Sequence, residues 1–106
     1  MKFRTPIFAV VFAAMLASYA TADTAVATKW RLIGSAQNDC MSHAESALLT
    51  AGFDRADPGS QSMNGKHGDY TASIRCVSEQ NMVFFVMTGP SPATAAQYLE
   101  VLYGRF

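Results

Sequence analysis

The two cysteines of this chain, Cys40 and Cys76, constrain its fold more than any other feature of the 106-residue sequence. Cys40 begins a set of small and apolar residues at helical spacing, whereas Cys76 ends a segment in which apolar residues alternate with polar ones. A disulfide between them would therefore fasten a helix to a strand. In the chain-entropy model, closing a loop of this length stabilises a fold by roughly 4 kcal/mol. Two buried free thiols, and a redox or metal role, are the alternatives.

Residues 1–22 have the features of a secretory signal peptide. Lys2 and Arg4 form a basic start, an apolar run covers 7–17, and Ala-Thr-Ala at 20–22 has the small-x-small pattern of a cleavage site. The run is shorter than a bilayer-spanning helix needs, so we expect cleavage and no membrane anchor, with an uncleaved anchor as the alternative. We predict an exported protein, periplasmic or extracellular, whose cysteines meet an oxidising compartment.

Cleavage after residue 22 would leave 84 residues, enough for one domain. We expect a flexible leader at 23–27 and a single domain over 28–106. The removed segment holds two of the eight basic residues and none of the eight acidic ones, so six basic residues face eight acidic ones in the remainder. This weak acidity does not suit a phosphate backbone, and we expect no nucleic acid partner.

The first half of the domain has the pattern of a strand followed by a helix. Residues 28–34 alternate as a strand, with Trp30 and Leu32 on one face. Ser35 is placed to cap a helix that ends at Gly52, and Phe53 is placed to fold back as an apolar contact. The apolar stripe of that helix consists of Cys40, Ala44, Ala47, Leu48 and Ala51.

The second half has the pattern of a long loop, two strands and a helix. The segment 54–69 is irregular, although Asn64-Gly65 could turn a hairpin in which 61–63 pairs with the next strand. Residues 70–78 alternate, and residues 82–88 are apolar on both faces, as in a covered central strand. Ser91 and Pro92 suit the start of a second helix, whose buried stripe is Ala95, Tyr98, Leu99 and Leu102.

These elements predict an α+β, two-layer βαββα domain. The first two strands should run parallel through a right-handed crossover, with the third strand between them and both helices on one face of a three-stranded mixed sheet. The arrangement resembles a ferredoxin-like fold without its last strand. The resemblance concerns the fold alone and implies no function.

Three residue groups could carry chemistry, and each has a simpler explanation. Cys40 and His43 lie on one helix face and could bind copper with methionines, but a disulfide would remove the best ligand. Lys66-His67 could form an anion-binding turn or a solvated loop. No serine or cysteine is visibly paired with an oriented histidine. We therefore expect no catalytic residues, no metal ligands and no cofactor.

The segment 82–87 gives the strongest functional signal because helices can cover only one face of the sheet. One alternate set of its residues, either Met82, Phe84 and Val86 or Val83, Phe85 and Met87, should be exposed. Its expected neighbours are Ile33, Val77, Thr71 and Ser73, with Lys29, Arg31 and Arg75 at the rim. The alternative is that the 54–69 loop covers this face.

We predict a non-catalytic interaction module that forms a homodimer or docks another envelope protein through this face. The first strand offers a second surface, because its unpaired edge could be extended by another chain. A binder of small molecules or metal ions that uses the 54–69 loop is the alternative function, and an enzyme of unknown chemistry is a distant third.

Overall fold

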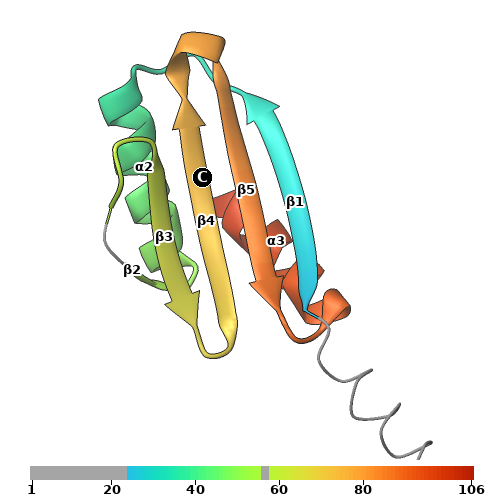
Figure 1. Ribbon diagram of the computed structural model, residues 1–106. Helices are drawn as coiled ribbons and strands as arrows, with labels where there is room; N and C mark the ends of the chain where they lie inside the picture. Colours follow the sequence, from blue (N-terminus) through green and yellow to red (C-terminus); the bar gives the residue numbers. More distant parts are fainter. Residues whose placement is uncertain (1–23, 56–57) are drawn as a thin grey trace, which may run out of the picture.

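The computed structural model describes residues 24–55 and 58–106, and the predicted signal peptide lies outside this part of the chain. Figure 1 shows a sheet with two helices behind it. Along the chain the elements are β1 (Ala25–Leu32), α2 (Gln37–Thr50), β2 (Asp54–Arg55), β3 (Ser62–His67), β4 (Tyr70–Val77), the short 3-10 helix η1 (Ser78–Gln80), β5 (Met82–Gly89) and α3 (Pro92–Arg105).

The sheet order is β1-β5-β4-β3-β2, and every hydrogen-bonded pair of strands is antiparallel. β5 lies between β1 and β4, which run parallel to each other as predicted. The predictions of three strands and of a mixed sheet are wrong. The sheet has four long strands and the two-residue β2, and its parallel strands are not neighbours. β1 also begins at Ala25, so residues 25–27 belong to a strand and not to a flexible leader.

The additional strands come from the segment that was predicted to be a loop. β3 pairs with β4 through a tight turn at Gly68 and Asp69, whereas the sequence favoured a turn at Asn64-Gly65. Gly65 lies inside β3, where a Cβ atom would collide with the carbonyl oxygen of Asp54. This glycine therefore permits the close approach of β2, and it does not form a turn.

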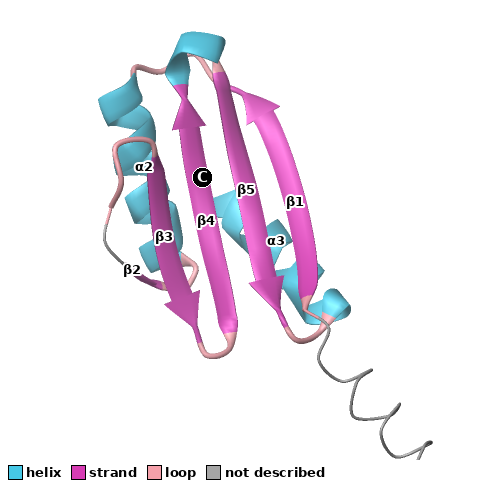
Figure 2. Ribbon diagram, viewed as in Figure 1, coloured by secondary structure: helices cyan, strands magenta, loops and turns pink. Residues whose placement is uncertain are grey.

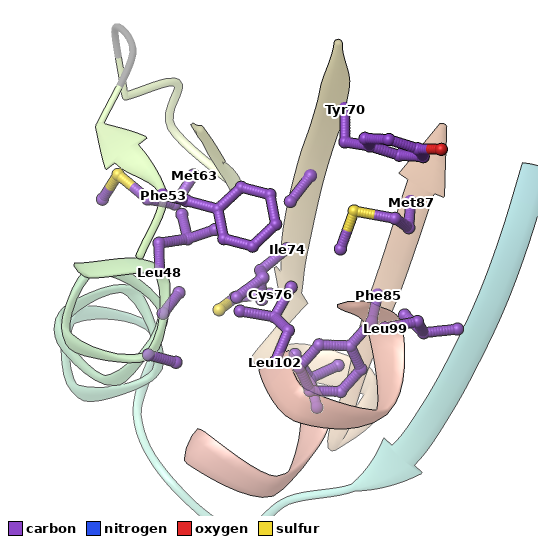
Figure 3. Close-up of a cluster of buried hydrophobic side chains, with 14 of the residues drawn as sticks. Leu48, Phe53, Met63, Tyr70, Ile74, Cys76, Phe85, Met87, Leu99 and Leu102 are labelled. Atoms are coloured by element: carbon purple, nitrogen blue, oxygen red, sulfur yellow. The ribbon is translucent and has the colours of Figure 1, made fainter. Parts of the chain in front are cut away.

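Both helices cover the same face of the sheet, as predicted (Figure 2). α2 packs on β3 and β4, and α3 packs on β1 and β5. The core lies between the two layers (Figure 3) and is formed by the predicted helix stripes together with alternate residues of the strands. Its largest fully buried side chains are Phe85, Leu48, Ile74, Met87, Leu102 and Val83.

The helix ends follow local sequence signals, with one exception. The N–H groups of Gly52 and Phe53 donate to the carbonyls of Leu49 and Leu48, and Gly52 has a φ of +90°, which is the predicted glycine C-cap of α2. The Ser91 hydroxyl accepts from the N–H of Thr94 and caps α3, also as predicted. The prediction that Ser35 caps α2 is wrong, because Ala36 occupies the N-cap position without a side-chain hydrogen bond.

The disulfide between Cys40 and Cys76 is present, with 6.0 Å between the two Cα atoms. Both cysteines are fully buried, and they join α2 to β4 as predicted. Gln37 supports the same junction, because its side-chain amide donates to the carbonyl of Cys76 and its oxygen accepts from the N–H of Ser78. The start of α2 is therefore fixed to β4 by the disulfide and one hydrogen bond, and to η1 by a second hydrogen bond.

Candidate functional site

The sheet face opposite the helices is the candidate functional site. None of the described elements lies over this face in Figure 1, where it is turned toward the viewer. The register places corresponding residues of neighbouring strands side by side, so Trp30 of β1 lies next to Phe84 of β5, which lies next to Arg75 of β4. We call this surface the open face.

The alternating burial of β5 determines which of its residues belong to the open face. Val83, Phe85 and Met87 are fully buried in the core beneath the helices. The other alternate set, Met82, Phe84 and Val86, is half-buried and lies on the open face. The sequence predicted that one of these two sets would lie on the uncovered face but did not say which. In the structure it is Met82, Phe84 and Val86 that lie there.

The side chains of β1 point to the opposite faces of the sheet from those that were predicted. Its burial alternates so that Val26, Trp30 and Leu32 are 63%, 55% and 70% exposed, and all three lie on the open face. Lys29 and Arg31 were expected at the rim of the open face, and they lie instead on the helix side of the sheet together with Ile33. The most exposed apolar side chains of the sheet are therefore those of its edge strand.

Helix α3 provides partners that let β1 place two cations toward the helices. The ammonium group of Lys29 lies 2.6 Å from a carboxylate oxygen of Glu100 and 4.4 Å from the ring centre of Tyr103. The guanidinium of Arg31 lies 4.8 Å from the ring centre of Tyr103 and 5.0 Å from that of Phe106. The charged groups of both side chains thus lie over aromatic rings, an arrangement in which the ring face attracts the cation.

The apolar residues of the open face gather at the β1 and β5 side. Together they form the open-face patch: Val26, Trp30, Leu32, Val77, Met82, Phe84 and Val86. The β3 and β4 side is polar, as predicted for Thr71 and Ser73. Arg75 is exposed there and donates to the side-chain oxygen of Gln61 at 2.6 Å. The open face is therefore half apolar and half polar, and Arg75 lies at the boundary between the two halves, next to Phe84.

The described residues of 54–69 do not cover the open face, because they extend the sheet beyond β4 as β2 and β3. Lys66 is exposed. A ring nitrogen of His67 lies 2.9 Å from the carbonyl oxygen of Gly52, and its ring packs against Phe53 and Tyr98. These contacts give His67 a structural role, in which it joins the β3–β4 turn to the end of α2.

The other candidate residues are not brought together. Cys40 is in the disulfide, and the exposed ring of His43 packs edge-on against Phe106. Within residues 24–55 and 58–106, no three histidine, cysteine, aspartate or glutamate side chains are grouped as metal ligands. A shallow hollow of about 360 Å³ lies beside Gln37 and is lined by Ser60, Gln61, Ser78 and Glu79.

The comparisons with known proteins do not assign a family. No protein-family model matches this chain, and no curated protein matches it significantly. In the described part of the chain, none of the helices has the length and hydropathy needed to cross a membrane. The open face is thus the feature from which a function can be argued.

Proposed function

We propose that this protein is an exported interaction module that pairs with a second copy of itself through the open face. The observation that carries the proposal is the open-face patch, in which Trp30, Leu32 and Val26 are each more than half exposed. Contiguous apolar surface with a polar border is typical of interaction sites. Export is supported by the buried disulfide, because such bonds persist in oxidising compartments.

The size of the open face is sufficient for a dimer. Its three longest strands have eight residues each, and at about 3.4 Å per residue they run for roughly 27 Å. Four strands spaced by about 4.8 Å give a width of roughly 19 Å, so two copies that overlap across the whole face would bury at most about 1,000 Å² in total. Specific interfaces begin near this size. We therefore expect a dimer that forms at micromolar to high micromolar concentrations.

The distribution of side chains also suits a two-fold arrangement. The patch occupies one side of the face, so a two-fold axis through it sets apolar residues against apolar residues. Trp30 and Phe84 would lie near the centre of the contact, where large aromatic residues contribute most to binding. Lys66 lies on β3, away from the patch, and would remain at the solvated border. Arg75 adjoins Phe84, and its guanidinium is held by the side-chain oxygen of Gln61 beside the contact.

Sedimentation velocity from about 1 µM to 1 mM tests the proposal with two matched variants. Leu32→Glu places a charge in the patch, and Leu49→Glu places the same charge on α2, where Leu49 is 55% exposed. The wild-type protein and Leu49→Glu should dimerise as concentration rises, whereas Leu32→Glu should stay monomeric. A wild-type protein that remains monomeric throughout, or equal dimerisation of both variants, would contradict the proposal.

A further inference from the structure

The outer edge of β1 is a second surface, which borders the open face. β1 pairs with β5 on one side, and no described strand pairs with it on the other. The N–H of Ile33 donates to the carbonyl oxygen of Asn81 at 2.8 Å, which continues the β1–β5 register. Backbone groups of successive strand residues point to alternate sides. The N–H and C=O groups of Val26, Thr28, Trp30 and Leu32 therefore point outward from this edge.

The side chains on the two faces of this edge have different chemistry. On the open face, a strand added to β1 would lie beside Val26, Trp30 and Leu32, which are all exposed. On the helix side it would lie beside Lys29 and Arg31. Lys29 has Glu100 as its carboxylate partner, whereas the guanidinium of Arg31 lies over aromatic rings. The helix side of the edge thus presents more positive than negative charge.

We propose that the outer edge of β1 binds an extended segment of another protein in which apolar and acidic residues alternate. Side chains that lie opposite each other on paired strands interact directly, so acidic residues would face Lys29 and Arg31 while apolar residues extend the open-face patch. A second copy of β1 would add two cations to the same side. Cationic residues that point inward on an edge strand oppose such self-pairing, and they favour an acidic partner.

The probe is a blocked octapeptide in which glutamate and valine alternate. Its control has the same composition with all four glutamates before the four valines. Titration of the purified protein at low salt, followed by Trp30 fluorescence and by calorimetry, should show the alternating peptide binding tighter by on the order of tenfold. Arg31→Gln should weaken this binding severalfold, whereas the matched variant Arg75→Gln, on β4, should leave it unchanged.

Two further probes test whether the backbone edge itself is used. Thr28→Pro removes one outward N–H group, which an edge strand tolerates, and it should abolish binding. If that variant fails to fold, N-methylation of the peptide replaces it. Methyl groups on the amides facing β1 should abolish binding, and methyl groups on the opposite amides should not. Any of four results would overturn the proposal. These are equal binding of the two peptides, equal effects of the two methylation patterns, no binding at about 1 mM, and pairing of β1 with its own copy.

Discussion

At the scale of single residues, the contact between Tyr70 and Gly89 shows that the packing of a large side chain can depend on a glycine, which has no side chain of its own. The Tyr70 ring lies over Gly89, where a Cβ atom would collide with it, and its hydroxyl accepts from the N–H of Ser91. The ring also meets Tyr98 edge-on, with 5.0 Å between ring centres. In the sequence, Gly89 is visible only as the end of a strand. Its role in making space for a ring depends on a residue 19 positions earlier.

Gly89→Ala should therefore destabilise the protein by about 1–3 kcal/mol, because the added methyl group overpacks a filled site. Gly34→Ala is the control, since no atom lies within 4 Å of the position that its Cβ would take. Urea unfolding of both variants measures the difference. If Gly89→Ala unfolds at the same urea concentration as the control, the packing of Tyr70 does not depend on the glycine.

At the scale of elements, the sequence predicts those whose apolar residues form a helical period, an alternation or a continuous run, and it misses β2 and the full length of β3, which have no such pattern. Both helices and β4 were predicted because apolar residues mark their buried faces, and β5 was predicted because it is apolar on both faces. β3 was missed as a long strand because only Met63 and Gly65 are buried within it, and neither forms an apolar pattern. β1 was predicted, but its buried face was not. Cations lie on that face because α3 supplies Glu100 and Tyr103, which periodicity alone does not reveal.

The disulfide is the strongest single link between elements, since it joins α2 to β4. Replacing both cysteines by alanine should lower the free energy of unfolding by about 4 kcal/mol, because the unfolded chain regains the entropy of an open loop. Chemical denaturation of the double variant and of the reduced wild-type protein measures this loss. Both should be destabilised to a similar extent. A loss below about 1 kcal/mol would show that packing alone holds the two elements together.

At the scale of the whole molecule, the sequence predicts a layered domain with one uncovered face to which residues 82–87 contribute, but the most exposed apolar side chains of that face belong to β1. It does not predict which alternate set of 82–87 is exposed, because a strand that is apolar on both sides gives no preference. The contribution of Trp30 and Leu32 also depends on the orientation of β1 against α3. The candidate site is therefore partly encoded in local pattern and partly in contacts between distant segments.

The proposed export gives a prediction for the intact protein. Protein purified from its native compartment should lack residues 1–22, because we expect cleavage there. Mass spectrometry without reduction should give the mass of residues 23–106 less two hydrogens, the signature of the disulfide. A species that retains residues 1–22 would contradict the proposed processing, and free thiols would place the protein in a reducing compartment.

The emission of Trp30 as a function of protein concentration tests the central claim most directly. Trp30 is the only tryptophan of the chain, it is 55% exposed, and it lies within the open-face patch. If the open faces of two copies pack together, its emission should shift to shorter wavelength and its quenching by acrylamide should fall between about 1 µM and 1 mM. Leu32→Glu should prevent both changes. Constant emission and constant quenching over that range would contradict association through the open face.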